Sequence, residues 1–249
     1  MKTTAIIPAA GSGTRMGKHP SATPPPSLQK RASKLFLMLG DMPVLAHTLL
    51  AFDRASEVDE VIVAAREDDI LLIWDMISEF GITKVSKIIN GGSSRSESVR
   101  AAILEVSDDT SIIAIHDGAR PLIAPKLIDT AIAEAARKGA VTLAVPVKDT
   151  IKRVSANGVI EETLERDSLY QIQTPQVFRA ELIKEAYEQE LQSSVSYADS
   201  SFQKEPLTAN DDCELVESLG VAVHIVKGDY ANIKITTTED IAIAEGLIL

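Results

Sequence analysis

Residues 5–17 read Ala5-Ile-Ile-Pro-Ala-Ala-Gly-Ser-Gly-Thr-Arg-Met-Gly17, and the organisation of the chain follows from this segment. The apolar run Ala5-Ile6-Ile7 has the length and bulk of a buried strand. Glycines and small residues follow it, so the backbone can approach a ligand closely and its successive N–H groups can surround an anion. Arg15 adds a planar guanidinium that matches phosphate. The segment therefore predicts a strand followed by a loop that binds a phosphorylated ligand.

The spacing of the glycines distinguishes this loop from two common phosphate-binding motifs. The P-loop requires Gly-x-x-x-x-Gly-Lys-Ser/Thr, but His19 follows Gly17-Lys18 in this chain. The dinucleotide fingerprint Gly-x-Gly-x-x-Gly requires a glycine at the position of Met16, which excludes an NAD-dependent oxidoreductase. An ordinary turn between a strand and a helix stays open as the alternative for this loop.

The overall composition restricts the kinds of partner. The chain has 249 residues and a formal net charge of −11, so it lacks the excess of Lys and Arg on which nucleic-acid binding depends. Aromatic residues make up only 4%, which leaves little material for stacking bases. The single Cys213 excludes an intramolecular disulfide and fits a reducing compartment. Without a signal peptide or an apolar run of roughly 18 residues, a cytoplasmic protein with no nucleic-acid or membrane partner is expected.

Apolar runs and helical patterns alternate along the chain. Strands are expected at residues 58–65, 84–89, 111–115, 140–145 and 221–226. Helices are expected at residues 43–54, 68–80, 96–106, 125–138, 180–191 and 211–219, with a last helix that one of residues 236–238 caps. This alternation predicts an α/β fold of Rossmann-like, three-layer type with a mostly parallel sheet. Ligands bind such sheets beyond the carboxyl ends of the strands, where the first loop lies.

A second glycine pair follows the strand expected at residues 84–89. Gly91 and Gly92 precede a serine-rich helix start, where backbone N–H groups are available to an anion or a polar base. Capping of this helix by Ser93 or Ser94 is the alternative interpretation.

The strand expected at residues 111–115 ends beside a carboxylate. Asp117 stands next to Gly118, and a carboxylate at a strand end can hold Mg²⁺ together with phosphates. A turn residue or a helix cap is the alternative for Asp117. Arg120 follows closely and is a candidate for binding phosphate.

Two lysines are candidates for the same cleft. Lys34 follows a polar, proline-rich segment at residues 18–33, which cannot form a helix or an interior strand. This segment is interpreted either as a surface insertion or as a lid over bound nucleotide. Lys30 is the competing candidate for the role of Lys34. Lys234 lies between Ile233 and Ile235 on an expected short strand, so it faces away from both. Such a lysine either protects a solvated edge or enters the cleft, and the cleft is favoured.

A projecting hairpin is expected after the fourth strand. Asn157-Gly158 lies between two alternating runs at residues 145–154 and 159–164, which is a strong hairpin signal. Both runs are polar on both faces, and an isolated two-stranded ribbon is marginally stable. We therefore expect residues 147–168 to form an arm that packs on a partner.

Five motifs, in order, resemble those of 2-C-methyl-D-erythritol 4-phosphate cytidylyltransferases. They are A-A-G-x-G-x-R-M from Ala9, G-G-x-x-R-x-x-S-V from Gly91, H-D-x-A-R-P from His116, Q-T-P-Q-x-F from Gln173 and N-I-K-I-T from Asn232. The first motif is also typical of nucleotidyltransferases that use CTP, UTP or GTP. The resemblance implies the fold of nucleotide-diphospho-sugar transferases, in a single domain over residues 1–249. It also implies transfer of a cytidylyl group from CTP, with release of pyrophosphate, in isoprenoid precursor synthesis.

The resemblance also implies residue roles. Catalysis is expected from Arg15, Lys34 and Lys234. Nucleotide binding is expected from Ala9, Ala10, Gly11, Ser12, Gly13, Gly91, Gly92 and Ser98. Binding of the phosphorylated polyol is expected from Arg120, Thr150, Arg166, Thr174 and Asp211. A Mg²⁺ or another divalent cation is expected at Asp117, and a homodimer is expected to exchange the arms of residues 147–168.

Several alternatives stay open. Gln173 and Gln176 are equally well explained by a turn before the helix expected at 180–191. Asp211 lies in the string N-D-D-C-E, which matches the family only partly, and it is equally well explained as a helix cap. His116 is expected to be packed at a strand end and Cys213 to be a small buried residue without nucleophilic function. Ribitol 5-phosphate cytidylyltransferases share most of the motifs, and a non-catalytic nucleotide sensor is an alternative of another class.

Overall fold

The computed structural model describes residues 1–11, 33–198 and 209–248, so the predicted roles of Ser12, Gly13 and Arg15, and the competing Lys30, lie outside the described residues. In the part that is described, no helix is long and apolar enough to cross a membrane.

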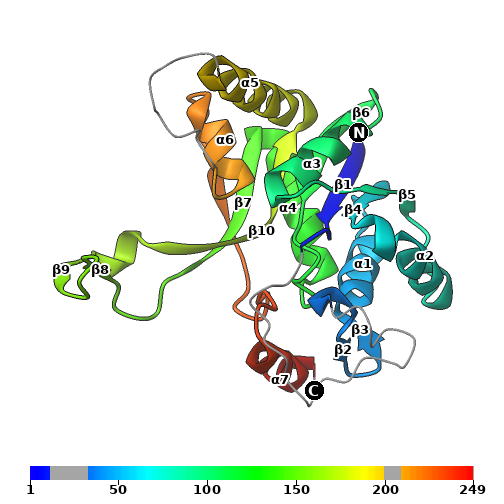
Figure 1. Ribbon diagram of the computed structural model, residues 1–249, viewed down its shortest axis with the longest axis horizontal. Helices are drawn as coiled ribbons and strands as arrows, with labels where there is room; N and C mark the ends of the chain where they lie inside the picture. The colour runs from blue at the N-terminus through cyan, green and yellow to red at the C-terminus, as the bar shows by residue number, and fades with distance from the viewer. Residues whose placement is uncertain (12–32, 199–208, 249) are drawn as a thin grey trace.

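Seven strands form one mixed sheet (Figure 1) in the order β11-β7-β10-β6-β1-β4-β5. They are β1 (Lys2–Pro8), β4 (Glu60–Ala65), β5 (Val85–Asn90), β6 (Thr110–Ile115), β7 (Ala140–Pro146), β10 (Tyr170–Arg179) and β11 (His224–Lys227). Neighbouring strands are parallel except at β10, which runs antiparallel to β6 and β7. The predicted α/β class with a mostly parallel sheet is confirmed.

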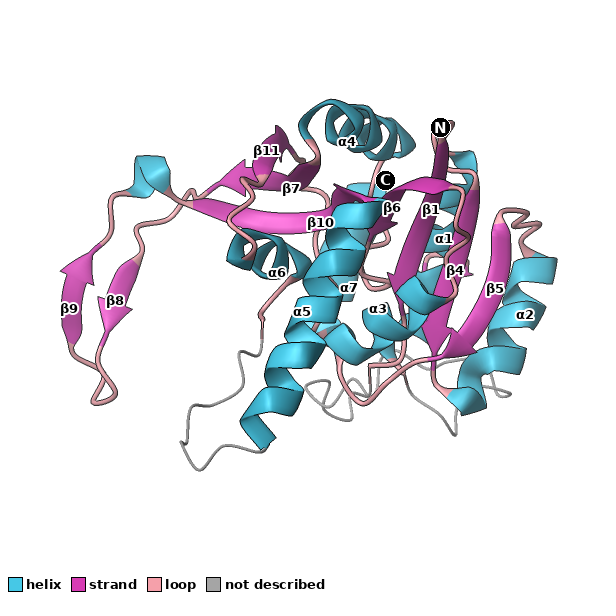
Figure 2. Ribbon diagram, turned by 90° about the horizontal axis from the view of Figure 1, so that it is seen from above, coloured by secondary structure: helices cyan, strands magenta, loops and turns pink. Residues whose placement is uncertain are grey.

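Helices cover both faces of the sheet (Figure 2). They are α1 (Val44–Arg54), α2 (Ile70–Glu79), α3 (Arg95–Leu104), α4 (Pro125–Lys138), α5 (Ala180–Ala198), α6 (Asp212–Ser218) and α7 (Thr238–Ile248). Strand β1 shows how the layers are joined, because neighbouring side chains of a strand point to opposite faces. Ile7 packs in the core with α1, α2 and α4, whereas Ile6 packs in the second core with α3, α5 and α6. Each of these fully buried isoleucines stabilises the fold by roughly 1.5–3 kcal/mol.

The predicted helix positions agree with the structure, and their ends have local causes. Helix α4 begins with Pro125 in its first turn and ends at Gly139, whose φ of 91° suits glycine. Helix α5 continues to Ala198, beyond the predicted end at residue 191. The strand predicted at residues 221–226 is shifted, because pairing with β7 begins only at His224.

The sequence analysis predicts no strand where β10 lies, and a turn before the next helix is only one alternative there, for Gln173 and Gln176. In the structure, residues from Tyr170 to Arg179 form a ten-residue strand between β6 and β7. Pro175, which lacks an N–H donor, lies between Ile172 and Gln176, where the register with β7 shifts. The antiparallel insertion brings Thr174 beside the end of β6, where the candidate residue Asp117 lies.

Short elements complete the fold. Strands β2 (Met38–Leu39) and β3 (Met42–Pro43) pair after the 3-10 turn η1 (Lys34–Phe36), and η2 (Glu67–Asp69) precedes α2. Strands β8 (Lys152–Val154) and β9 (Ile160–Thr163) form the expected hairpin, and η3 (Arg166–Ser168) follows it. The hairpin projects from the rest of the fold in both views (Figures 1 and 2).

Candidate active site

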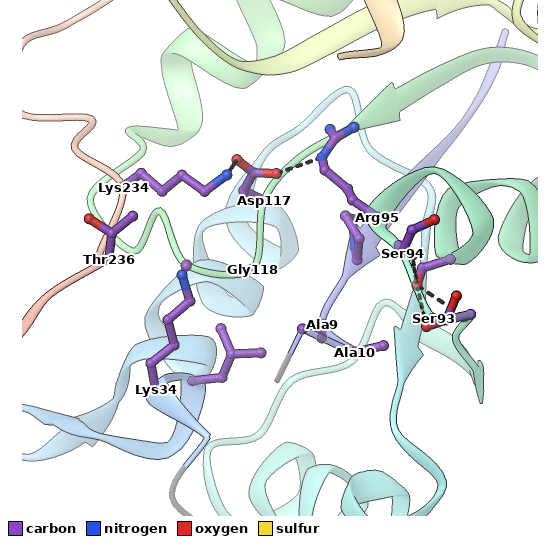
Figure 3. A pocket seen from close by; sticks show the side chains of 16 residues that line it. Ala9, Ala10, Lys34, Ser93, Ser94, Arg95, Asp117, Gly118, Lys234 and Thr236 are labelled. Carbon is purple, nitrogen blue, oxygen red and sulfur yellow. Dashed lines mark hydrogen bonds and ion pairs between the residues drawn. The ribbon is translucent and has the colours of Figure 1, made fainter. Parts of the chain in front are cut away.

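A cavity of about 290 Å³ opens at the carboxyl ends of β1, β5 and β6. Its described lining combines loop backbone with three cationic side chains and one carboxylate, and consists of Pro8, Ala9, Ala10, Gly11, Lys34, Leu35, Gly92, Ser93, Ser94, Arg95, Ser98, Asp117, Gly118, Ala119, Lys234 and Thr236. Figure 3 shows Lys34 and Lys234 on one side of the cavity and the start of α3 on the other. Although the chain has a formal charge of −11, this cleft is locally basic and suits an anionic ligand.

Backbone hydrogen bonds tie both glycine loops to the end of β4. The N–H of Ala9 donates to the carbonyl of Ala64 over 2.7 Å, and the N–H of Gly91 donates to the carbonyl of Ala65 over 2.7 Å. A Cβ at Gly91 would lie 2.5 Å from the Cβ of Ala10, a distance that real Cβ atoms do not show. Glycine at position 91 therefore permits the close approach of the two loops, of which Ala10 and Gly92 line the cleft and Gly91 itself does not.

The start of α3 combines a capped helix with a cleft wall. The hydroxyl of Ser94 accepts a hydrogen bond from the N–H of Glu97, so Ser94 is the N-cap. The carboxylate of Glu97 accepts from the N–H and the hydroxyl of Ser93, and Ser98 accepts from the N–H of Gly92. Capping and lining are thus both realised, since Gly92, Ser93, Ser94 and Ser98 all line the cleft.

Asp117 is surrounded by positive charge. Its Oδ1 lies 3.0 Å from Nε of Arg95, and its Oδ2 lies 2.8 Å from Nζ of Lys234 and 3.6 Å from Nε of Arg120. Burial alone would raise the pKa of Asp117, but the three neighbouring cations hold that pKa well below its usual range. Asp117 is therefore ionised at neutral pH, and it is the one carboxylate among the described residues that line the cleft.

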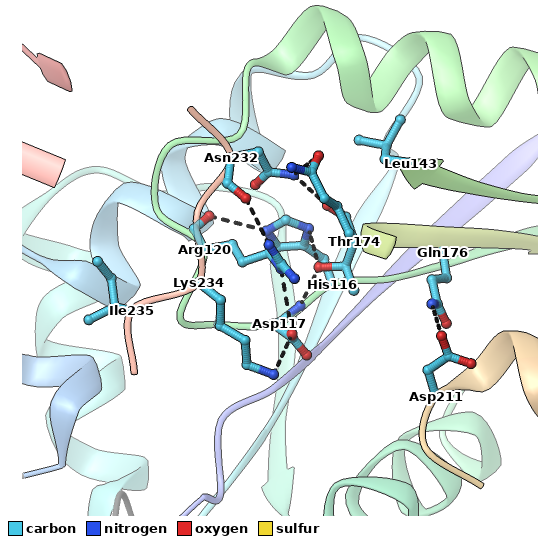
Figure 4. A network of polar contacts seen from close by, with 12 residues as sticks. His116, Asp117, Arg120, Leu143, Thr174, Gln176, Asp211, Asn232, Lys234 and Ile235 are labelled. Atoms are coloured by element: carbon cyan, nitrogen blue, oxygen red, sulfur yellow. Dashed lines mark hydrogen bonds and ion pairs between the residues drawn. The ribbon is translucent and has the colours of Figure 1, made fainter. Parts of the chain in front are cut away.

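A buried chain of hydrogen bonds fixes the backbone of Asp117 (Figure 4). The N–H of Asp117 donates to the hydroxyl of Thr174, which lies 3.0 Å from Nδ1 of His116. Nε2 of His116 lies 3.2 Å from the carbonyl of Arg120, which only accepts, so Nε2 carries the proton and Nδ1 accepts from Thr174. Burial lowers the pKa of His116 to about 3, which keeps the ring neutral. The structure thus places Thr174 behind Asp117, and His116 is a packed strand-end residue, as predicted.

The segment around Lys234 is held by buried polar groups and is not the short strand predicted from its sequence. The side chain of Asn232 donates to the carbonyl of Thr174 over 2.8 Å, and the carbonyl of Asn232 accepts from Arg120 over 2.7 Å. The N–H of Ile235 donates to the carbonyl of Ala119. These contacts take the place of strand pairing and carry Lys234 into the cleft, the favoured of its two predicted positions.

Lys34 contacts the segment that carries Lys234. It begins the 3-10 turn η1, and its Nζ donates to the carbonyl of Ile235 over 2.8 Å. Two candidate catalytic lysines, 200 residues apart in sequence, are therefore brought to one wall of the cleft (Figure 3).

Other predicted residues lie outside the cleft lining. Arg120 is largely buried behind Asp117, where it contacts Asn232. Thr150 and Arg166 lie at the two ends of the projecting hairpin, and the guanidinium of Arg166 donates to the carbonyl of Lys148. Asp211 is the N-cap of α6 and accepts from the side chain of Gln176, so the capping interpretation describes its contacts in the structure.

The comparisons with known proteins show the family of the chain. The family model of the 2-C-methyl-D-erythritol 4-phosphate cytidylyltransferases, IspD, matches residues 3–249. The chain belongs to this family. A cytidylyltransferase of Alkaliphilus metalliredigens is 39% identical over 99% of this chain and 93% of its own length, and one of Pelotomaculum thermopropionicum is 41% identical over 99% and 94%.

Solved structures of the family have the same fold. The 4-diphosphocytidyl-2C-methyl-D-erythritol synthase of Anaerococcus prevotii superposes with a TM-score of 0.78 at 30% identity, over 99% of this chain and 96% of that one. The cytidylyltransferase of Thermus thermophilus superposes with a TM-score of 0.72 at 26% identity, over 100% and 99%. Membership in the IspD family makes this chain a nucleotidyltransferase, and it favours neither the ribitol 5-phosphate alternative nor the sensor alternative.

The lining residues to which the sequence interpretation gave no role include Arg95 and three loop positions beside Asp117 and Lys234. Arg95 was part of the quoted motif G-G-x-x-R, but it received no role of its own. Gly118, Ala119 and Thr236 also line the cleft. The signal that could have identified these three residues is their position in the motifs, next to Asp117 or Lys234. Loop residues that flank a ligand-binding side chain lie with it at the strand ends.

Asp117 is the one carboxylate among the described lining residues that could contribute to a metal site, and its oxygens are ion-paired with Arg95 and Lys234. Among the described residues, no group of three or more His, Cys, Asp or Glu is arranged to hold a metal ion. The described residues therefore do not provide a metal site made entirely of protein ligands. Mg²⁺ is commonly held by one or two carboxylates together with phosphates, so Asp117 is the described residue that would hold it, and the metal stays a prediction.

Cys213, the single cysteine of this chain, is expected to be unreactive. Burial, with the charges of Asp211 and Asp212, raises the pKa of the Cys213 thiol. A raised pKa lowers the thiolate fraction at neutral pH, so native protein should react with Ellman's reagent more slowly than unfolded protein by about 10²-fold or more. The rate of release of the coloured thiolate at pH 8, with and without guanidinium chloride, measures this. Equal rates would contradict the assignment, and Cys213→Ala should keep transfer activity.

Proposed function

We propose that the chain transfers the cytidylyl group of CTP to 2-C-methyl-D-erythritol 4-phosphate in this cleft, for isoprenoid precursor synthesis in the cytoplasm. An oxygen of the acceptor's phosphate attacks the α-phosphorus of CTP. The bond from the α-phosphorus to the bridging oxygen breaks, and pyrophosphate leaves with that oxygen. The product is 4-diphosphocytidyl-2-C-methyl-D-erythritol. The acceptor phosphate is already ionised, so the reaction requires neither a protein nucleophile nor a strong base.

The observation that supports this proposal most directly is the grouping of Lys34, Lys234 and Asp117 beside the two glycine loops. Two polyanions must be brought together, and charge grows on the leaving pyrophosphate. Preorganised cations and backbone N–H groups stabilise such charge in the transition state. A protein that only bound nucleotide would not need this arrangement, so the geometry favours catalysis.

Roles within the cleft follow from position and charge. We assign the backbone of Ala9, Ala10 and Gly11 and the Gly91–Gly92 loop to the nucleotide, and the ammonium groups of Lys34 and Lys234 to its phosphates. Arg15, Ser12 and Gly13 keep their proposed roles from the motif A-A-G-x-G-x-R-M. A Mg²⁺ held by Asp117 and phosphates would neutralise charge on the phosphates as a Lewis acid.

The transferred atoms can be followed by labelling, which tests the type of reaction. With CTP labelled at the α-phosphate, the label should appear in the acceptor product. With CTP labelled at the γ-phosphate, it should appear only in pyrophosphate. Transfer of the γ-label to the acceptor would instead show phosphoryl transfer and would overturn the proposal.

We also propose that the acceptor site is completed by a second copy of the chain. The hairpin exposes apolar side chains, with Val154, Val159 and Ile160 exposed by 49%, 62% and 60%. A two-stranded ribbon is rarely stable alone, and these side chains would be covered in a dimer that exchanges arms. Thr150 and Arg166 at the ends of the hairpin would then bind the acceptor phosphate in the partner's cleft.

Mixing two inactive variants tests the exchange of arms. One subunit carries Arg166→Ala and the other carries Lys34→Ala. If Arg166 acts in the partner's cleft, a mixed dimer has both defects in one site, and its other site is intact. Random mixing of equal amounts should restore about a quarter of wild-type activity, because half of the dimers are mixed. Light scattering measures the dimer in parallel. No recovery from a confirmed mixed dimer would place Arg166 in its own subunit's site.

A further inference from the structure

Asp212 is a fully buried carboxylate behind the cleft to which the proposed reaction gives no role. It is the first residue of α6, and both of its oxygens are engaged. Oδ1 accepts a hydrogen bond of 2.6 Å from the hydroxyl of Tyr187 on α5, and Oδ2 accepts one of 2.7 Å from Nη2 of Arg95. A buried carboxylate is costly unless it is paired and hydrogen-bonded, and here a residue of the cleft provides the pairing.

Arg95 connects Asp212 to the centre of the cleft. Its Nε donates to Oδ1 of Asp117 over 3.0 Å, while its Nη2 donates to Asp212. A guanidinium is planar, so two contacts on different edges fix the orientation of its plane. With Asp117 alone as its partner, the side chain could turn about a single hydrogen bond.

The charges of the cluster are consistent with this arrangement. Burial lowers the pKa of Arg95, but the charges of Asp212 and Asp117 outweigh it and raise that pKa, so the guanidinium stays charged. Burial and the charge of Asp212 raise the pKa of the Tyr187 phenol, so its hydroxyl acts as a donor. The neighbouring carboxylate of Asp211 accepts from the N–H of Glu214 and from the side chain of Gln176.

We propose that Asp212, held by Tyr187, is a positioning residue that orients Arg95 against Asp117 and thereby fixes the carboxylate at the centre of the cleft. Within the string Asn210-Asp-Asp-Cys-Glu214, the acidic residue that acts on the reaction is then Asp212, and it acts through Arg95. The inference rests on the proposed function, because cytidylyl transfer is the activity that Arg95 supports.

A double-mutant cycle separates positioning from a general structural role. Arg95→Ala should lower kcat/KM by about 10²-fold, the cost of a mispositioned reactive group. Asp212→Asn should lower it by about tenfold or more, mostly in kcat, because Arg95 loses one of its two contacts. The double variant should be no worse than Arg95→Ala alone. Losses that multiply in the double variant would overturn the inference.

Chemical rescue gives a second and more specific readout. Millimolar guanidinium should restore part of the activity of Arg95→Ala, because Asp212 and Asp117 together form a binding place for that ion. It should not rescue Arg95→Ala/Asp212→Asn. Equal rescue of both variants would show that Asp212 does not position the guanidinium.

A milder variant covers the case in which Asp212→Asn fails to fold. Tyr187→Phe keeps both carboxylates and removes one hydrogen bond, so it should lower kcat by about two- to tenfold and should cause no further loss in the Arg95→Ala background. Multiplying losses would contradict the inference. An inactive wild type would refute the proposed function, whereas an active wild type with independent losses would refute only the role of Asp212.

Discussion

Lys34→Ala is expected to lower kcat for cytidylyl transfer by about 10²–10³-fold while CTP binding stays measurable, because the lysine acts on charge that develops in the transition state. In the structure its ammonium group lies at the wall of the cleft, within 2.8 Å of the carbonyl of Ile235 in the segment that carries Lys234. A nucleotide phosphate carries full negative charge and can compete with this carbonyl for the ammonium group. Steady-state kinetics with CTP, together with calorimetry of CTP binding, separates the two effects.

The controls for this prediction are chosen by charge. Lys126→Ala removes an exposed lysine from the first turn of α4 and should leave kcat unchanged. Lys34→Arg keeps the charge but changes its geometry, and it should be intermediate. If Lys34→Ala kept the wild-type kcat, the lysine would have no place in the mechanism.

Asp117→Asn is expected to be at least as damaging, with kcat/KM reduced by about 10³-fold, because the cation cluster and the proposed metal site both depend on its charge. The substitution preserves the shape of the side chain but leaves Arg95, Arg120 and Lys234 without their shared anion. The same loss should lower the melting temperature, because removing one partner of a buried ion pair is destabilising. Kinetics over a range of Mg²⁺ concentrations, with thermal unfolding, measures both consequences.

The dependence on Mg²⁺ distinguishes the two roles of Asp117. If Asp117 holds the metal, the Mg²⁺ concentration for half-maximal activity should rise in Asp117→Asn, whereas the exposed control Asp75→Asn should match the wild type. An unchanged requirement for Mg²⁺ with lower kcat would assign Asp117 to organising the cations alone. Wild-type kinetics in Asp117→Asn would contradict both roles.

The layers of the fold were predictable because buried side chains recur along the sequence with the period of the helix or strand that carries them. Ile6 and Ile7 supply opposite cores from one short strand, and Pro125 and Gly139 mark the ends of α4 at the predicted residues. Strand β10 was not predictable in this way, because Gln173-Thr-Pro-Gln176 has neither an apolar run nor alternation. Its position depends on pairing with β6 and β7, which are distant in sequence.

The candidate site was predictable to the extent that each motif carries its own chemistry. Lys34, Asp117 and Lys234 come together as the motifs indicated. The partners of Arg95 were not predictable, because Asp212 and Tyr187 meet it only through the packing of α3, α5 and α6. For the same reason, a local pattern could not tell Asp211, a helix cap, from Asp212, which contacts the cleft through Arg95.

The most direct test is the release of pyrophosphate from CTP with Mg²⁺ and a choice of acceptor. We expect rapid release with 2-C-methyl-D-erythritol 4-phosphate and little with ribitol 5-phosphate at the same concentration. A preference for ribitol 5-phosphate would keep the reaction and the cleft but contradict the assigned acceptor. No release with either acceptor, from folded protein that binds CTP, would contradict the catalytic function itself.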